Sequence, residues 1–203
     1  MSGSYPIIYA DPPWQYRDKA HSGKRGVDYK YPTMTLDDIC HLDVPNLAAD
    51  DATLFMWATM PLLPDALRVM ESWGFTYKTV AFVWVKTYPK AGTPFWGMGS
   101  WTRANAEFVM LGVRGKPKRI SASVHQIVHA PTIEAPIERH SKKPDIFRDK
   151  IVELMGDKPR LEMFARQASE GWDIWGNEVD CSLDIELRPV VSGERPRVIA
   201  GGR

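Results

Sequence analysis

Cysteine, long apolar runs and an excess of charge of one sign are all scarce in this sequence. Its two cysteines, Cys40 and Cys181, are far apart, which argues against a disulfide framework and a cysteine-rich zinc site. No run of about 18 or more apolar residues occurs, and residues 1–6 lack the basic and apolar regions of a secretory signal. We therefore expect a protein of a reducing compartment, the cytoplasm, with no membrane partner.

The charges nearly balance, with 26 Lys and Arg against 25 Asp and Glu, so the overall field attracts polyanions only weakly. Contact with phosphates would have to come from local basic stretches, residues 19–30 and 114–119. The sequence also lacks a Gly-x-Gly-x-x-Gly loop after a strand, which argues against nicotinamide or flavin binding. His125 and His129 have no third ligand nearby in the sequence, so we expect no metal site.

Short apolar runs alternate with helical patterns over most of the chain. Strands are expected over residues 6–10, 52–58, 79–85, 107–113, 121–129, 160–164 and 172–175. Helices are expected after Thr33 or Thr35, over 62–73 ended by Gly74, and over 143–155 ended by Gly156. This alternation predicts an α/β fold with a mostly parallel sheet and helices on both faces. Residues 1–180 form one expected domain, and residues 181–203, rich in Pro, Gly and Arg, a poorly ordered tail.

A short polar motif, Asp11-Pro12-Pro13-Trp14, directly follows the first expected strand. Parallel sheets bind ligands beyond the carboxyl ends of their strands, so this motif lies where a ligand is expected. Two consecutive prolines hold the backbone rigid and contribute no N–H donors, which leaves the Asp11 carboxylate and the proline carbonyls as acceptors. Trp14 adds a flat surface on which a base can stack.

Such a set of acceptors suits the amino group of adenine, whose nitrogen is a poor nucleophile because its lone pair is delocalised into the ring. Asp11 can accept a hydrogen bond from one N–H and a carbonyl of Pro12 or Pro13 from the other, which favours a pyramidal nitrogen. The alternative interpretation is a strand followed by a tight turn in which Asp11 caps a helix.

The chain resembles the MT-A70-like family of S-adenosylmethionine-dependent adenine N6-methyltransferases from about Ile7 to Glu178. The matching blocks follow the family's order and cover residues 9–14, 31–34, 82–87, 101–107, 111–115, 140–145, 162–166 and 171–178. The resemblance implies a Rossmann-like class I methyltransferase fold in residues 1–180. The catalytic motif precedes the cofactor-binding strand, so the resemblance also implies a permuted order of motifs.

The resemblance assigns catalysis to the motif itself: Asp11 and the Pro12 carbonyl hold the amine, beside Pro13, and Trp14 shapes the base pocket. It places the substrate side at Tyr16, Tyr31, Trp101, Arg103, Asn105 and Glu107. The expected substrate is a nucleic acid, DNA rather than RNA, because the compact chain resembles the bacterial and phage members. The relatives also suggest a homodimer.

For the cofactor S-adenosylmethionine, the resemblance implies Lys143 near the methionine portion and Asp11 near the amino group. The adenosine half is implied to lie at Arg166, Ser169, Asn177 and Glu178. Two departures from longer relatives stand out: a segment before the first strand that supplies adenine contacts has no counterpart, and Ala168–Ser169 replace a His and an Asn.

Three other functions compete with this interpretation. The substrate could be RNA, or the chain could be a non-catalytic partner subunit that only helps to bind nucleic acid. The intact Asp11-Pro12-Pro13-Trp14 motif argues against a subunit without activity. A methyltransferase for a small molecule or a protein amide is the third alternative, which the basic loop around Lys24 and Arg25 disfavours.

Overall fold

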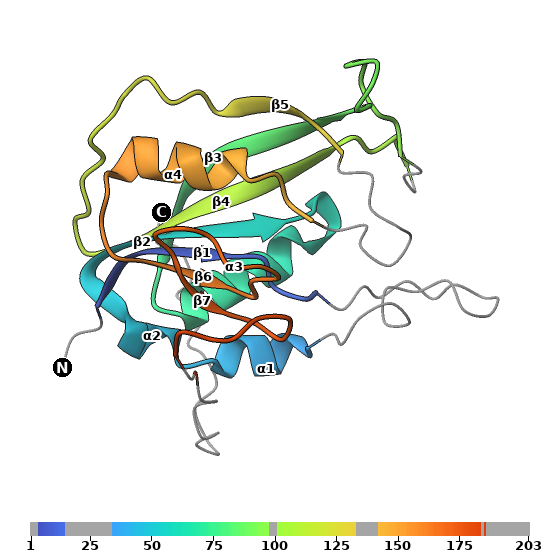
Figure 1. Ribbon diagram of the computed structural model, residues 1–203. Helices are drawn as coiled ribbons and strands as arrows, with labels where there is room; N and C mark the ends of the chain where they lie inside the picture. The colour runs from blue at the N-terminus through green and yellow to red at the C-terminus, as the bar shows by residue number, and fades with distance from the viewer. Residues whose placement is uncertain (1–3, 15–33, 98–100, 133–141, 184, 186–203) are drawn as a thin grey trace, which may run out of the picture.

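The computed structural model describes residues 4–14, 34–97, 101–132, 142–183 and 185 (Figure 1). Within these residues one sheet has the strand order β5-β3-β4-β2-β1-β6-β7. The strands are β1 (Tyr5–Ala10), β2 (Ala48–Ala58), β3 (Thr76–Thr87), β4 (Ala106–Arg114), β5 (Ile127–Pro131), β6 (Arg160–Met163) and β7 (Asp173–Trp175). The helices are α1 (Leu36–His41), α2 (Val44–Leu47), the 3₁₀ turn η2 (Met60–Leu62), α3 (Leu63–Ser72) and α4 (Ile146–Met155).

The strand directions bring several chain segments to one edge of the sheet. β1 runs parallel to β2 and β6, β7 parallel to β6, and β5 parallel to β3. β4 is antiparallel to both of its neighbours, β2 and β3. The start of β4 therefore lies at the same edge as the ends of the other strands. The predicted α/β fold with a mostly parallel sheet is confirmed, with β4 as its antiparallel member.

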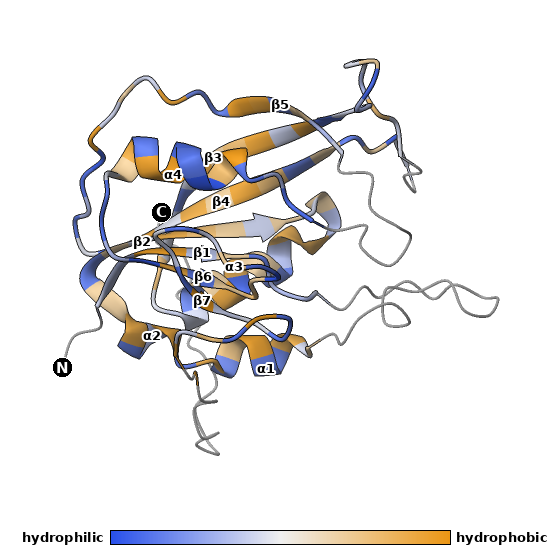
Figure 2. Cartoon of the chain, viewed as in Figure 1, coloured by the Kyte–Doolittle hydropathy of each residue, from blue (hydrophilic) through white to orange (hydrophobic). Residues whose placement is uncertain are grey.

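Helices cover both faces of this sheet, as predicted, and each face has its own core. On one face α1 and α3 pack over the sheet, with Ile39, Val69 and Trp73 buried against Ile8 and Leu54. On the other face α4 buries Phe147 and Ile151 against Tyr9, Phe55 and Trp57. Neighbouring residues of β1 and β2 thus enter opposite cores, as strand alternation requires. Figure 2 shows the central strands as largely apolar, whereas α1 and α4 are banded with polar and apolar residues.

Some predicted boundaries were wrong. Of the strand predicted over 121–129, only residues 127–129 lie in a strand, β5 (Ile127–Pro131). Residues 121–126 form no strand, and some of their polar groups bond locally, for example Ser121 Oγ with Ser123 Oγ. The helix predicted from Lys143 begins at Ile146, after the N-cap Asp145, so Pro144 precedes the cap. The helix predicted over 62–73 is η2 followed by α3, and α2 was not predicted.

Other predicted boundaries were close. Thr35 caps α1 by accepting the N–H of Asp38 at 3.1 Å, and Gly74 and Gly156 follow α3 and α4 with positive φ, of 79° and 89°. At the start of the predicted tail, Ser182 exchanges hydrogen bonds with the backbone of Ile174, and residues 186–203 lie outside the described residues. In the described part of the chain no helix has the length and apolar character needed to cross a bilayer.

Candidate active site

The Asp11-Pro12-Pro13-Trp14 motif lies at the carboxyl end of β1, as predicted. The Asp11 N–H donates to the Met163 carbonyl at 3.4 Å, which holds the motif beside the end of β6. The Pro12 carbonyl accepts the N–H of Trp14 at 2.8 Å, and the Pro13 carbonyl accepts the N–H of Met34 at 3.2 Å. Each carbonyl has two lone pairs, so each keeps the capacity for one further hydrogen bond.

Trp14 is packed more deeply than a stacking surface requires. Its side chain is part of the core that includes α1 and α3, and only 7% of the residue is exposed. The indole N–H donates to the Trp57 carbonyl at 3.2 Å, which fixes the ring against the end of β2. Trp14 therefore forms a rigid wall beside Asp11, with little exposed area of its own.

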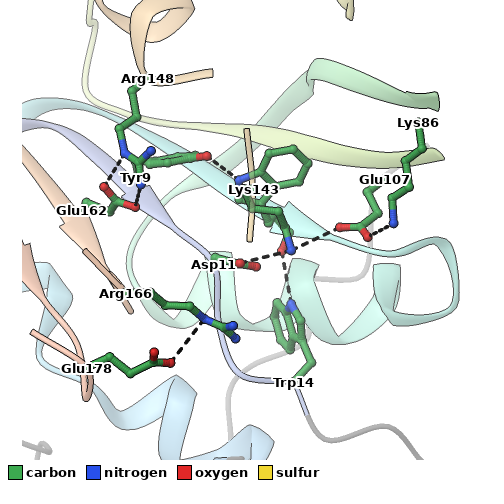
Figure 3. Close-up of polar contacts among 11 residues, drawn as sticks. Tyr9, Asp11, Trp14, Lys86, Glu107, Lys143, Arg148, Glu162, Arg166 and Glu178 are labelled. Atoms are coloured by element: carbon green, nitrogen blue, oxygen red, sulfur yellow. Dashed lines mark hydrogen bonds and ion pairs between the residues drawn. The ribbon is translucent and has the colours of Figure 1, made fainter. Parts of the chain in front are cut away.

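Four charged side chains form a chain of ion pairs next to this motif (Figure 3). The Lys143 ammonium lies between two carboxylates, 3.1 Å from Asp11 Oδ2 and 3.2 Å from Glu107 Oε2. The second oxygen of Glu107, Oε1, lies 2.5 Å from the Lys86 ammonium. Lys143 is 11% exposed and also lies 5.3 Å from the centroid of the Trp57 ring. Segments before α4, after β1, at the start of β4 and at the end of β3 thus meet at one point.

Burial and charge act against each other within this chain. Burial raises the pKa of Asp11, Lys143 opposes the rise, and Glu107 adds to it. Burial also acts to raise the pKa of Glu107, but Lys143 and Lys86 outweigh it and lower that pKa to about 2. The two carboxylates likewise overcome burial at Lys143 and raise its pKa. Glu107 and Lys143 are therefore charged at neutral pH, and Asp11 is the member that acid neutralises first.

A second group of polar side chains follows β6 and β7 at the same edge. The Arg166 Nε lies 3.7 Å from Glu178 Oε1 (Figure 3). Gly176 makes this approach possible, because a Cβ there would lie 2.1 Å from the Ala165 carbonyl oxygen. Asn177 and Glu178 are exposed, and the positive charge of Arg166 also acts on Asp11. These residues offer a carboxylate and an amide to the hydroxyl groups of a ribose, within reach of the motif, so they fit a nucleoside cofactor.

Comparison with known proteins identifies the family. The family model MT-A70 matches residues 5–178, most of the chain. The chain belongs to the MT-A70 family. This match confirms the family that was predicted from the sequence blocks. It also confirms the prediction that the chain is an enzyme of the methyltransferase class.

Three relatives illustrate the range of the MT-A70 family. The Type II methyltransferase M.MunI of Mycoplasma sp is 36% identical over 200 residues, which cover 89% of this chain and 81% of the relative. An N(6)-adenosine-methyltransferase MT-A70-like protein of Arabidopsis thaliana is 29% identical over 88% of this chain and 24% of its own length. The N(6)-adenosine-methyltransferase catalytic subunit METTL3 of Homo sapiens is 27% identical over 88% of this chain and 29% of its own. The match thus spans about a quarter of these two eukaryotic relatives.

Several residues that the MT-A70 resemblance assigned to substrate are not themselves members of the chain of ion pairs. Trp101 is 98% exposed, and Arg103 is also exposed, in the segment that leads into β4. Asn105 uses its carbonyl to accept the Lys86 N–H at 2.9 Å. Tyr16, Tyr31 and the basic stretch of residues 19–30 lie outside the described residues. Of the predicted substrate residues described, Glu107 is a member of the ion-pair chain, and Asn105 contacts it through the backbone of Lys86.

The remaining predicted residues have local roles in the MT-A70 fold. Ser169 accepts the Trp172 N–H at its carbonyl, 3.1 Å away, in the turn between β6 and β7. His125 lies just before β5 and His129 lies within it, and both are exposed, so the two histidines do not share a helix face. Among the described residues, no three His, Cys, Asp or Glu side chains are grouped as metal ligands would be.

Sequence reasoning missed a polar cluster around Arg148, which joins α4 to β6 and to the residues before α4. Arg148 of α4 binds both carboxylate oxygens of Glu162 on β6 at 2.6 Å and also donates to Asp145 at 2.6 Å. The Trp57 indole N–H donates to the Tyr9 hydroxyl at 2.6 Å, and Arg148 lies 5.9 Å from the centroid of the Tyr9 ring. A polar Glu162 inside the apolar run 161–164 was the signal that could have indicated a buried partner.

Proposed function

We propose that this chain transfers a methyl group from S-adenosylmethionine to the N6 amino group of adenine in a nucleic acid, with DNA favoured over RNA. The observation that carries the proposal is the position of Asp11, an acceptor at the end of β1 that lies 3.1 Å from the buried cation of Lys143. Adenine N6 methylation is also the chemistry named for several relatives, among them the human and Arabidopsis proteins.

Asp11 and the Pro12 carbonyl hold the amine in this proposal. Each accepts one N–H bond, so the nitrogen becomes pyramidal and presents its lone pair. Bound S-adenosylmethionine supplies a methyl group that is electrophilic because it is carried on a sulfonium. As the new N–C bond forms, the old S–C bond breaks and its electron pair stays on sulfur. The nitrogen then loses one proton, which the Asp11 carboxylate accepts and passes to water.

Lys143, Arg166, Asn177 and Glu178 would hold the cofactor, and we also assign to it Ser169, in the connection between β6 and β7. Glu178 accepts hydrogen bonds from ribose hydroxyls, as acidic residues do at strand ends of dinucleotide folds. Lys143 places a positive charge at the edge where the carboxylate of the methionine portion would lie. In addition, its contacts with Asp11 and Glu107 hold the Lys143 ammonium beside Asp11, where the adenine amine would bind.

The nucleic acid would approach over the segment between β3 and β4. Trp96 and Trp101 are 54% and 98% exposed there, with Lys90 and Arg103 also exposed, so the segment offers flat rings and positive charge together. Tyr16 and Tyr31 complete the proposed substrate side. The preference for DNA rests on a greater likeness to the bacterial relative, at 36% identity, than to the eukaryotic proteins at 29% and 27%.

Methyl transfer to separate pools of DNA and RNA tests this function. The full chain is incubated with radiolabelled donor and each pool, and the labelled nucleoside is identified by mass spectrometry. We expect N6-methyldeoxyadenosine from DNA and little label in RNA. Label in RNA alone would show that the substrate is RNA and not DNA. Label in neither pool would contradict the proposed function.

Asp11→Ala is the decisive variant, because it removes the acceptor for the amine. We expect methyl transfer to fall by a factor of about a thousand or more, while cofactor affinity falls only in part. Asp50→Ala is the matched control, since Asp50 is exposed near the opposite end of β2 and should leave turnover unchanged. Turnover like that of the wild type in Asp11→Ala would overturn the assignment.

A further inference from the structure

Lys86 lies at the end of β3 and has no part in the proposed chemistry. Its ammonium lies 2.5 Å from Glu107 Oε1 and 4.9 Å from the centroid of the Trp84 ring. Its N–H donates to the Asn105 carbonyl, and its carbonyl accepts the Phe95 N–H, both at 2.9 Å. The side chain is 22% exposed, which is low for a lysine. Backbone and side chain are thus both held in place.

We propose that Lys86 is a positioning residue for methyl transfer: by binding one oxygen of Glu107, it directs the other oxygen to Lys143 and keeps that ammonium beside Asp11. The proposal rests on the proposed function, because it assigns Asp11 to the amine. In this role Lys86 acts through Glu107 and Lys143, and not through a contact of its own with the reacting groups.

This inference rests on how the two carboxylate oxygens of Glu107 are shared between Lys86 and Lys143. Oε1 lies 2.5 Å from Lys86 and Oε2 lies 3.2 Å from Lys143, so each lysine has an oxygen of its own. The register of the sheet supports the arrangement, because Trp84 pairs with Glu107 and Lys86 lies two residues further along the same face. Without Lys86, both oxygens could turn to Lys143 and draw its ammonium away from Asp11.

The balance of charge points the same way. Two carboxylates, Asp11 and Glu107, face two ammonium groups, Lys86 and Lys143, and Arg166 is a further cation that acts on Asp11. Removing Lys86 would leave two carboxylates to share the single ammonium of Lys143. Like charges that share one counter-charge resist ionisation, so the pKa of Glu107, and with it that of Asp11, would rise.

A merely structural ion pair between strands makes a different prediction. Such a pair contributes to the stability of the β3–β4 hairpin, but its loss leaves the ionisation of Asp11 as it was. The pH dependence of the reaction therefore separates the two interpretations, whereas thermal stability does not.

The test compares Lys86→Met, which keeps the length of the side chain without its charge, with Lys86→Arg, which keeps the charge. Lys78→Met is the matched control, because Lys78 is an exposed lysine on the same strand. Two measurements are made on the full chain: kcat and KM for methyl transfer as functions of pH, and the NMR titration of the Glu107 carboxyl carbon.

For Lys86→Met we expect kcat to fall about tenfold at neutral pH with a smaller change in KM. We expect the acid limb of its pH profile to move to higher pH by about one unit, and the Glu107 titration to move with it. Lys86→Arg should return the acid limb and the Glu107 titration to their wild-type pH values, and Lys78→Met should match the wild type in both.

Two results would overturn the role of Lys86. One is an unshifted Glu107 titration in Lys86→Met, and the other is a loss of activity with an unchanged pH profile. If the wild type methylates neither DNA nor RNA, the proposed function fails instead. The NMR titration needs no turnover, so it still decides whether Lys86 controls the charge of Glu107.

Discussion

At the scale of single residues, the site depends on opposing effects of burial and charge. Asp11, Glu107 and Lys143 are each mostly buried, with side chains 25%, 17% and 11% exposed. Burial of an unpaired charge costs free energy, so each of them needs a partner of opposite charge to stay ionised. Lys143 and Lys86 together offset the cost of burial for Glu107, whereas Lys143 offsets only part of it for Asp11. Asp11 must be ionised to accept the amine, so the acid limb of activity should follow its raised pKa.

The variant Glu107→Gln tests this electrostatic account. Glu107 raises the pKa of Asp11, so removing its charge should lower that pKa and move the acid limb of kcat/KM to lower pH. This direction is opposite to the one expected for Lys86→Met. Total activity should also fall, because Lys143 loses a partner at 3.2 Å, so the measurement is the position of the limb and not its height. A limb that moves to higher pH would show that Glu107 does not repel Asp11.

At the scale of elements, one ion pair attaches helix α4 to the sheet. Arg148 binds Glu162 of β6 with two hydrogen bonds of 2.6 Å, and both residues are at most 9% exposed. The same guanidinium binds Asp145, the N-cap of α4, two residues after Lys143. The pair therefore fixes the start of α4, and with it the segment that carries Lys143.

Removing one member of this buried pair should be costly. We expect Arg148→Met to lower the free energy of unfolding by about 3–5 kcal/mol, because Glu162 stays buried without its counter-charge. The double variant Arg148→Met with Glu162→Leu should recover most of the loss, because no charge is then buried. Urea denaturation followed by tryptophan fluorescence measures both values. Equal losses in the single and double variants would show that packing, and not the charge, holds α4.

At the scale of the whole molecule, the candidate site joins the two ends of the described chain. Asp11 follows the first strand and Glu178 follows the last one, and both lie at the same edge because β1, β6 and β7 are parallel neighbours. A ligand that contacts both would bind the folded state alone. Cofactor binding should therefore stabilise the entire fold.

A thermal shift with S-adenosylhomocysteine, the product of the donor, tests this coupling. We expect the Tm of the wild type to rise with ligand concentration. Glu178→Ala should lose most of the shift with little change in Tm without ligand, because Glu178 is 57% exposed and contributes little to packing. Glu170→Ala is the control that should keep the shift, because Glu170 is another exposed glutamate but precedes β7, whereas Glu178 follows it. A full shift in Glu178→Ala would place the ribose elsewhere.

Sequence patterns located the elements well because those patterns are local. Apolar runs marked β1 and β2, and a threonine and two glycines marked helix ends, since caps depend on nearby residues. The strand predicted over 121–129 was mostly wrong, because side-chain hydrogen bonds hold its first residues, between Ser121 and Ser123 and from Gln126 to the Val80 carbonyl, and a count of apolar residues ignores such bonds. The placement of Trp14 in a core could not be predicted, because an aromatic residue at a strand end suits both a wall and a stacking surface.

The sequence by itself determined that an aspartate followed by two prolines ends a buried strand, and that acceptors for an amine lie at the binding edge of an α/β sheet. Only the tertiary structure decided which cations meet that aspartate. Lys143, Glu107 and Lys86 come from distant parts of the chain, and no local pattern encodes their contacts. Strand order and the antiparallel direction of β4 bring them together, because hydrogen bonding between strands links segments regardless of their separation in sequence.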